Sequence, residues 1–365
     1  MARVLLVGKG PPDVGGIPTF LHMLQSSSTG RHQVSFLNVA HHGTPEAGRI
    51  TQGNILRTCR DTWSVWREAR KSDIVHIHSA LTPAVTVLRA GMFAAAARAG
   101  GCAVLVHAHG GNLQSWVSSR KARLTLKASM IPAQQVIAVW QVGAEALTEI
   151  LGAQRVRLID NGVDTLRFSP AFSAPPAAVP TVLYVGLLTP RKGLLDLLES
   201  SRLLTARGVK HQLVLVGGTP DEGPQARDAV LSATEGVAEI RGRVCSSDMP
   251  GLLRSADIFC LPSWWEAMPL SLLEAMASGL PAVTTNVGDT SRAVENEVNG
   301  FLVPPNNPGE LADALERLLV DEDLRQQMGE AARLRAVEGF SLDVLLGSID
   351  SLYQEAASLG RRRRS

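Results

Sequence analysis

The sequence predicts an α/β protein made of two doubly wound domains. Short apolar runs alternate with longer segments of helical pattern, the apolar runs are continuous, and the same scheme occurs twice along the chain. Continuous apolar strands separated by helices are typical of parallel sheets that are covered on both faces. A chain of 365 residues is long enough for two such domains, each with its own core.

Strands are expected at the short runs rich in valine, isoleucine and leucine, and helices at the longer segments between them. In the first half the expected strands are 4–7, 34–37, 74–78, 103–107, 136–139 and 156–159, and the expected helices are 17–27, 54–71, 83–99, 116–131 and 142–151. In the second half the expected strands are 182–185, 212–216, 238–241, 257–261, 282–285 and 301–303, and the expected helices are 192–207, 222–234, 247–255, 269–278, 290–297 and 308–339.

The boundary between the two sets of elements falls at a turn followed by a stiff segment. Asn161-Gly162-Val163-Asp164 has the composition of a turn, and 169–180 is rich in proline and alanine, as linkers are. The predicted parts are, in order, a domain at 1–165, a linker at 166–180, a domain at 181–340, a helix at 341–358 and a basic tail at 359–365. The helix could pack on either domain, and could complete the first. Because ligands of open α/β sheets bind beyond the carboxyl ends of the strands, the site is expected in a cleft between the two domains.

Composition narrows the class of protein. The formal net charge of +2 argues against a general nucleic-acid binder. The four cysteines show no paired spacing, which fits reduced thiols in the cytosol, and no His, Asp or Glu cluster has the spacing of metal ligands. The triplet Asp321-Glu322-Asp323 is expected to cap a helix. The N-terminus is interrupted too early for a signal peptide, and 83–100 carries two arginines and is expected to be a packed helix, so a cytoplasmic protein is expected.

The segment from Glu266 to Gly279 (EAMPLSLLEAMASG) is the most informative of the chain. Pro269 is well placed as the first residue of a helix, which puts Glu266 in the loop before it and Glu274 in its second turn. Leu272 and its apolar neighbours predict that this helix is buried around most of its girth. A helix N-terminus favours a phosphate, and a ribose diol offers two O–H donors to one carboxylate. The two acids therefore suggest a sugar nucleotide.

Two cations stand where a diphosphate would need them. Arg191 and Lys192 follow the first strand of the second domain and precede Gly193. An arginine can bind a phosphate through a fork and a lysine as a point charge. The alternative is a solvated helix start, but cations at a helix N-terminus oppose its dipole, which favours a functional role.

Several residues of the first domain are ambiguous from the sequence. Gly15 and Gly16 open a helix after the first strand, either as a tight turn or as a place where backbone approaches a ligand. His109 precedes Gly110 at the end of a strand and is as consistent with a structural role as with a catalytic one. His78 could line the cleft, whereas His76 and His107 are expected to be structural. In the second domain, Arg243 and Val244 follow Gly242 either in a simple turn or beside a flat base.

Two helical segments of the first domain are basic and carry tryptophan. They are 57–71 (RTCRDTWSVWREARK) and 116–130 (WVSSRKARLTLKASM). A charged face opposite Trp or Leu is typical of an interfacial helix, and equally of a solvated one. Their occurrence in one domain, together with four arginines near the C-terminus, suggests contact with a membrane surface, peripheral on its inner face.

Taken together these motifs resemble the retaining glycosyltransferases of family 4, which have the GT-B fold of two Rossmann-like domains. The resemblance rests on Glu266 and Glu274 with the continuation AMASGLPAV, and on Arg191-Lys192-Gly193 after YVGLL. Asn161-Gly162-Val163-Asp164, Gly15-Gly16, His109-Gly110 and the segment 299–303 (NGFLV) support it, so that it covers nearly the whole chain. The spelling EAMPLS is most similar to the group 1 transferases of polysaccharide biosynthesis in the cell envelope.

The resemblance implies transfer of a hexose from a nucleotide-sugar donor, expected to be a UDP-sugar, to a glycan or lipid-linked acceptor, without a metal or another cofactor. The first domain would bind the acceptor and the second the donor. Glu274 would hold the ribose hydroxyls, Glu266 the donor sugar, and the two cations the diphosphate. The implied catalytic residues are His109, Glu266, Arg191 and Lys192. The implied donor-binding residues are Gly16, Arg191, Lys192, Arg243, Val244, Glu266, Met268, Pro269, Leu270 and Glu274. The implied acceptor-binding residues are Gly15, His78 and Gly110.

The chain departs from the family pattern at one loop. Members often carry a glutamate in a segment written G-G-x-P-E, and this chain has Gly288-Asp289-Thr290-Ser291-Arg292 instead. The change leaves the choice of donor open. Two other functions share the architecture: a nucleotide-sugar epimerase, which conversion of the donor without acceptor would reveal, and a non-catalytic scaffold at a membrane, which would bind vesicles and no nucleotide.

Overall fold

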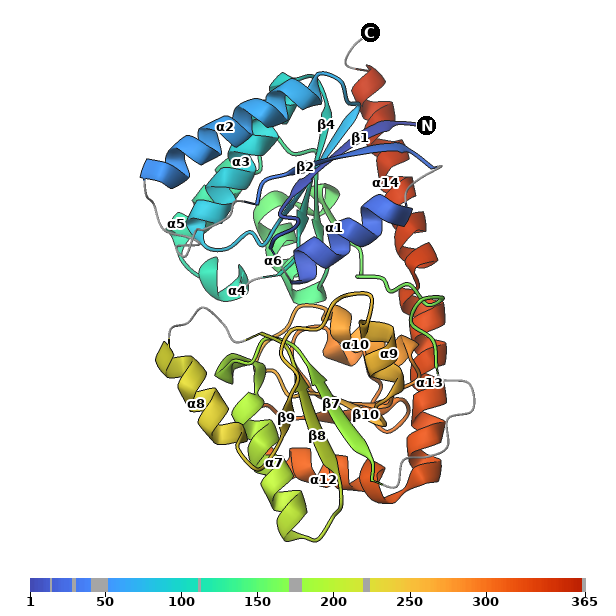
Figure 1. Ribbon diagram of the computed structural model, residues 1–365. Helices are drawn as coiled ribbons and strands as arrows, with labels where there is room; N and C mark the ends of the chain where they lie inside the picture. The colour runs from blue at the N-terminus through green and yellow to red at the C-terminus, as the bar shows by residue number, and fades with distance from the viewer. Residues whose placement is uncertain are drawn as a thin grey trace. The chain divides into compact units, whose positions relative to one another are not determined.

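The computed structural model describes residues 1–13, 15–27, 31–40, 52–110, 113–170, 179–218 and 224–362. The chain divides into two compact units, of which the first is Met1–Asn161 together with Leu345–Ser365 and the second is Gly162–Val344. Each unit is a parallel sheet covered by helices on both faces (Figure 1). The predicted α/β, doubly wound class is confirmed.

The first unit holds a six-stranded sheet with the order β2-β1-β3-β4-β5-β6. Its strands are β1 (Arg3–Gly8), β2 (Gln33–Asn38), β3 (Ile74–Ser79), β4 (Ala103–Ala108), β5 (Gln135–Ala138) and β6 (Val156–Leu158). The helices α2 (Gln52–Ala69), α3 (Ala84–Ala99), α5 (Arg120–Ser129) and α6 (Gln141–Leu151) cover one face (Figure 1). The helix α1 (Gly16–Ser27) and the part of α14 (Leu342–Arg362) from Leu345 onward cover the other. Short helices α4 (Leu113–Trp116) and η1 (Ala153–Arg155) complete the unit.

The second unit repeats this architecture with the strand order β12-β11-β10-β7-β8-β9. Its strands are β7 (Thr181–Val185), β8 (Gln212–Val216), β9 (Glu239–Ile240), β10 (Ile258–Leu261), β11 (Ala282–Thr285) and β12 (Gly300–Val303). Its helices are η2 (Pro190–Lys192), α7 (Leu194–Ala206), α8 (Pro224–Thr234), α9 (Met249–Arg254), α10 (Leu270–Ala277), α11 (Thr290–Ala293), α12 (Pro308–Val320) and α13 (Glu322–Phe340). The pair α7 and α12 packs on one face of the sheet, and α10 and α13 pack on the other.

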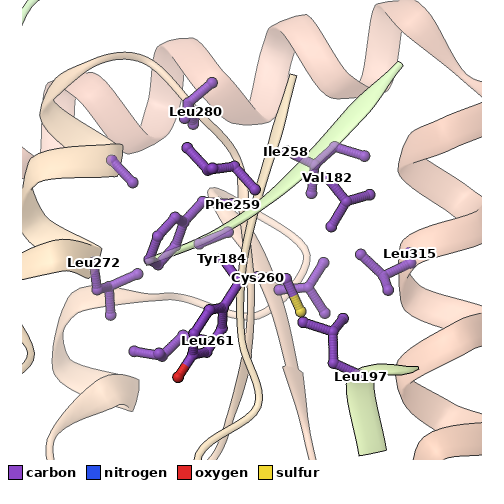
Figure 2. Close-up of a cluster of buried hydrophobic side chains, with 14 of the residues drawn as sticks. Val182, Tyr184, Leu197, Ile258, Phe259, Cys260, Leu261, Leu272, Leu280 and Leu315 are labelled. Carbon is purple, nitrogen blue, oxygen red and sulfur yellow. The ribbon is translucent and has the colours of Figure 1, made fainter. Parts of the chain in front are cut away.

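The core of the second unit sits between the central strands and these helices. Val182 and Tyr184 of β7 pack with Ile258 and Phe259 of β10, and Leu272 of α10 closes the cluster (Figure 2). All five side chains are buried. Burial of each large apolar side chain stabilises the fold by roughly 1.5–3 kcal/mol. The cluster therefore holds β7 and β10 in fixed positions below their carboxyl ends.

Most predicted helices differ from those observed by one or two residues at an end, whereas three are broken or end early, and hydrogen bonds to side chains explain these three. The helix expected at 116–131 is divided into α4 and α5, because Ser119 caps α5 by accepting from the Ala122 N–H at 3.2 Å. The helix expected at 308–339 breaks at Asp321, which caps α13 by accepting from the Leu324 N–H at 2.9 Å and confirms the predicted capping role. The helix expected at 290–297 ends at Ala293, whose carbonyl oxygen accepts from Asn299 Nδ2 at 3.1 Å.

The C-terminal helix belongs to the first unit from Leu345 onward. There Asp350 accepts from Arg31 at 2.7 Å, and Tyr353 packs in the core beside His32. Residues 171–178 of the predicted linker, and 363–365 of the predicted tail, lie outside the described residues, and α14 extends through Arg362. Within the described part of the chain, no helix has both the length and the apolar composition that crossing a membrane requires.

Candidate functional site

Two loops of the second unit meet at the carboxyl ends of β7 and β10. Gly193, between η2 and α7, has a left-handed backbone with φ of 70°, and a Cβ there would overlap the carbonyl oxygen of Pro262. The same two loops are also joined by a hydrogen bond, in which the Trp264 N–H donates to the carbonyl oxygen of Arg191 at 3.0 Å. Only glycine allows this approach of backbone to backbone. The β7–α7 and β10–α10 loops are thus fixed to each other.

This contact brings together two residues that the sequence singled out. Lys192 Nζ forms an ion pair with Glu266 Oε1, and the side chains are only 17% and 8% exposed. Ser263 Oγ donates to the same carboxylate oxygen at 2.7 Å, and Thr285 Oγ1 of β11 donates in turn to the Ser263 carbonyl oxygen. A buried carboxylate needs such partners. Arg191 is exposed beside this pair.

The helix α10 begins at the same loop. Pro269 is its N-cap residue, so the helix starts at Leu270, one residue later than expected, and no side chain caps it. Met268 and Pro269 are buried, and Leu270 is half-buried. An N-terminus without a side-chain cap has backbone N–H groups available for an anion.

Glu274 lies in the second turn of α10 and is half-buried among apolar neighbours. Burial raises the pKa of its carboxyl group to about 7, against the opposing positive charge of Arg167. Within the described residues no hydrogen bond holds its carboxylate. A half-buried acid with a raised pKa is typical of a functional site.

Arg243 crosses the end of the neighbouring strand β8. A Cβ at Gly218 would overlap Nε of Arg243, so the guanidinium side chain runs over the bare backbone of this glycine. The Leu188 N–H donates to the Gly218 carbonyl oxygen at 3.0 Å, which ties this position to the β7–α7 loop. Arg243 is exposed, and Val244 packs partly against the core. The structure therefore places Arg243 beside the loop that carries Lys192.

The loop that departs from the family pattern packs directly on Glu266. A Cβ at Gly288, with φ of 56°, would overlap the Glu266 carbonyl oxygen, and the Asp289 N–H donates to the Ala267 carbonyl oxygen at 2.9 Å. Arg292 Nη1 donates to the buried carboxylate of Asp289 at 3.0 Å. The arginine thus stands in an ion pair within this loop.

The candidate residues of the first unit form a separate set. Gly15 has φ of 134°, which favours glycine, and Gly16 begins α1 at a place where a Cβ would meet no atom of the described residues. His78 Nδ1 and His109 Nε2 are 2.8 Å apart, and Gly110 follows with φ of 109°. Burial lowers the pKa of His109 to about 3, so its imidazole is neutral at pH 7.

His76 and His107, which the sequence left as structural, lie beside His78 in the core. Burial lowers the pKa of all three, to about 3 for His76. No local spacing in the sequence indicated this cluster, because it depends on the pairing of β3 with β4. Ser263 and Thr285 were also missed, because the hydrogen bond between them depends on the packing of the β10–α10 loop on β11. Ser263 alone had a local signal, since it lies three residues before Glu266.

Two family models match the chain. The model described as Glycosyltransferase Family 4 matches residues 14–167, and the model described as Glycosyl transferases group 1 matches 168–335. The chain belongs to glycosyltransferase family 4. The two matches meet at residues 167 and 168, six residues after the boundary between the two units.

Among curated relatives of this family-4 chain is the alpha-D-kanosaminyltransferase of Streptomyces kanamyceticus, 32% identical over 182 residues, which are 48% of this chain and 46% of the relative. Another is the UDP-Gal:alpha-D-GlcNAc-diphosphoundecaprenol alpha-1,3-galactosyltransferase of Escherichia coli, 28% identical over 324 residues, 82% of this chain and 80% of the relative. The chain thus spans about half the length of the first relative and four fifths of the second.

Solved structures show the same fold. Sucrose-phosphate synthase from Thermosynechococcus elongatus matches with a TM-score of 0.77 at 21% identity, over 98% of this chain and 100% of that one. Anabaena HepE, solved in complex with UDP-glucose, matches with a TM-score of 0.77 at 19% identity, over 97% and 100%. The family-4 chain therefore has the GT-B fold, as the resemblance implied.

Proposed function

We propose that this chain is a retaining glycosyltransferase that moves a hexose from a UDP-sugar to a hydroxyl group of a lipid-linked or polysaccharide acceptor, without a metal ion. The observation that carries the proposal is the ion pair of Lys192 with Glu266, held at the start of α10 by Ser263. It joins a cation, an acid and a helix N-terminus in one small region of the second unit. A sugar diphosphate requires these three chemistries.

In this proposal the diphosphate is bound by Lys192, by the exposed Arg191 and by the N–H groups at the start of α10. All three stabilise negative charge, and that charge grows on the diphosphate as it leaves the sugar. Glu266 accepts hydrogen bonds from hydroxyl groups of the donor sugar, while Lys192 and Ser263 keep its carboxylate oriented.

The nucleoside follows from the neighbouring residues. Glu274, whose carboxylate has no hydrogen bond within the described residues, accepts from both hydroxyl groups of the ribose. Arg243 and Val244 flank the base beside the open backbone of Gly218. Two relatives support UDP: the E. coli enzyme is named for UDP-Gal, and HepE was solved with UDP-glucose. The ion pair of Arg292 with Asp289 distinguishes the sugar side of this site from that of members with a glutamate there.

The reaction requires no covalent intermediate with the protein. The acceptor oxygen forms a bond to the anomeric carbon while the bond from that carbon to the β-phosphate oxygen breaks. The acceptor proton passes to the departing phosphate, on the same face of the sugar, so that the configuration is retained. His109 is assigned to the sugar, and Gly15, Gly16 and Gly110 to the ligands of the first unit, whereas the buried His78 contacts His109 and orients it. Family membership favours transfer over the epimerase alternative.

A panel of UDP- and GDP-sugars tests the proposal, with donor hydrolysis and transfer as readouts and the anomeric configuration of the product determined by NMR. We expect turnover of a UDP-sugar that a chelator does not slow. Replacing both Arg191 and Lys192 by alanine should reduce turnover at least about a hundredfold, because an electrostatic contact to the leaving group is lost. The double variant of Arg207 and Lys210, two exposed cations at the other end of α7, removes the same charge and should keep turnover. The absence of nucleotide binding for every donor would refute the proposal.

A lipid-linked acceptor is supported by the surface of the first unit. The layer of α2, α3 and α5 exposes large apolar side chains: Ile55, Leu56, Trp63, Leu88, Met92 and Leu124. It also exposes cations: Arg60, Arg67, Arg70, Lys121 and Lys127. Apolar groups among cations are what an anionic membrane surface attracts.

Vesicle flotation tests the membrane contact. The protein should float with vesicles that contain anionic lipid and not with neutral ones, and replacing Leu56 and Trp63 by serine should weaken flotation. Flotation without nucleotide binding would instead indicate the non-catalytic scaffold.

A further inference from the structure

Three histidines gather on one face of the first sheet. Alternate side chains of a strand share a face, so His76 and His78 of β3 lie on the same side. The register pairs His78 with His107 of β4, which brings a third imidazole beside them. The ring centroid of His107 lies 5.3 Å from that of His76 and 5.2 Å from that of His78. Phe20 of α1 and Tyr353 of α14 pack against the cluster.

The cluster contains imidazole nitrogens that nothing satisfies. Nε2 of His76, Nε2 of His78 and both nitrogens of His107 have no hydrogen-bond partner among the described residues. The side chains of His76, His78 and His107 are 0%, 6% and 0% exposed, so bulk water does not form hydrogen bonds with these nitrogens. Burying a polar atom without a partner is costly, and such atoms in a native core require an explanation. One candidate donor nitrogen from each ring lies within 4.8 Å of the other two.

Contacts on the outer side of the rings orient two of them. His76 Nδ1 is 2.8 Å from Tyr353 Oη, and His78 Nδ1 is 2.8 Å from His109 Nε2. If each Nδ1 carries the proton and donates to these acceptors, each Nε2 keeps a lone pair. Histidines that ligate a metal use the second ring nitrogen in this way, to fix tautomer and orientation. The unpartnered Nε2 atoms of His76 and His78 are then lone pairs rather than N–H groups, and the neutral ring of His107 supplies a third lone pair on one of its two nitrogens.

We propose that His76, His78 and His107 bind one first-row transition-metal ion in the core of the first unit. Three imidazole nitrogens suit Zn²⁺, Cu²⁺, Ni²⁺ or Co²⁺, whereas Mg²⁺ and Ca²⁺ prefer oxygen ligands. The ion ties β3 to β4, and through Tyr353 to α14. It acts on the structure of the first unit, whereas the cations assigned to the diphosphate are in the second, so this site and metal-independent transfer are compatible.

Metal analysis of the full chain tests the site. The protein is unfolded with a chelator and refolded with or without Zn²⁺, and the metal is counted after desalting. We expect about one ion per chain. Protein refolded with Co²⁺ should show the visible absorption of nitrogen-coordinated Co²⁺ without a thiolate charge-transfer band, which excludes binding by the cysteines. Folded wild-type protein that holds no ion after refolding with Zn²⁺ overturns the proposal.

Variants place the ion. His107→Gln should abolish binding, and Tyr353→Phe, which keeps the ring, should weaken affinity about tenfold because an outer partner of His76 is lost. His211→Gln, a histidine of the second unit, is the matched control and should keep the ion. Retention of the ion in His107→Gln overturns the proposal. If that variant fails to fold, the metal affinity of Tyr353→Phe and the Co²⁺ spectrum of the wild-type protein still show whether the histidines bind the ion. UDP binding, measured on the same samples, should be unchanged by metal removal, and its loss in all samples would count against the proposed transferase rather than the metal site.

Discussion

Glu274 shows how the pKa of a single half-buried acid can indicate a ligand. Its pKa is about 7 in the folded chain against an ordinary value of 4.5. The folded state therefore binds more protons than the unfolded state between these values, so its contribution to stability is full below pH 4.5 and falls as pH rises toward 7. A ribose diol that donates to the carboxylate favours the ionised form, and opposes this shift.

Binding of UDP should accordingly release a proton near pH 7. Affinity should rise as pH increases from 6 to 8, by up to about tenfold per unit below the pKa of Glu274. Calorimetry in two buffers of different ionisation enthalpy measures the proton count. Glu274→Gln should bind more weakly and lose the dependence. An unchanged proton count in this variant would remove Glu274 from the ribose.

Lys192 and Glu266 should be coupled in stability as well as in turnover. Lys192→Ala leaves the Glu266 carboxylate, among the described residues, with the Ser263 hydroxyl group at 2.7 Å as its remaining hydrogen-bond partner, in a largely buried position. We expect a loss of about 2–4 kcal/mol in the free energy of unfolding of the second unit, partly recovered by adding Glu266→Gln. Arg207→Ala, which removes surface ion pairs with Asp313 and Glu316, should cost less than about 1 kcal/mol. Denaturant titration measures both, and equal losses would contradict a buried pair.

At the scale of elements, Gly193 is the position where the two loops of the site are in closest contact. A Cβ there meets the Pro262 backbone, whereas Gly208, after α7, has a similar φ of 78° and nothing near a Cβ. Gly208→Ala should therefore cost only the strain of the left-handed backbone, about 1 kcal/mol. Gly193→Ala should cost clearly more, and should weaken UDP binding because Lys192 moves away from Glu266. Thermal unfolding and UDP calorimetry compare the two, and equal effects would show that the loop contact does not position Lys192.

The sequence predicted most elements because their signals are local. Apolar runs marked the strands of the described residues except the short β9, and Pro269 located the start of α10 to within one residue. The predicted boundaries failed where a polar side chain competes with the helix, as Ser119 and Asn299 do. Such competition depends on which backbone groups lie nearby in three dimensions, which periodicity does not contain.

The same limit applies to the candidate site. Glu266 and Lys192 lie 74 residues apart in the chain. Both were found because each belongs to a short contiguous motif. Ser263 and Thr285 were not, because the hydrogen bond between them requires the packing of the β10–α10 loop on β11. The histidine cluster likewise needs the register of β3 against β4.

At the scale of the whole molecule, the first unit is completed by the end of the chain. Residues of α14 are buried in it: Leu345, Leu346, Ile349, Leu352 and Tyr353. At roughly 1.5–3 kcal/mol for each large apolar side chain, their removal costs on the order of 10 kcal/mol. That is as much as a domain usually has, so the first unit should not survive the loss of this helix.

Ending the chain at Val344 should therefore unfold the first unit and leave the second folded. Hydrogen exchange should show full loss of protection in β1, β3 and β4 while β7 and β10 stay protected. UDP binding should remain within about tenfold of the full chain, because Lys192, Glu266 and Glu274 all belong to the second unit. A chain that ends at Leu359 keeps the buried residues, loses only the basic tail, and should protect both sheets. Protection of β3 and β4 in the shorter chain would mean that α14 covers the first sheet without stabilising it.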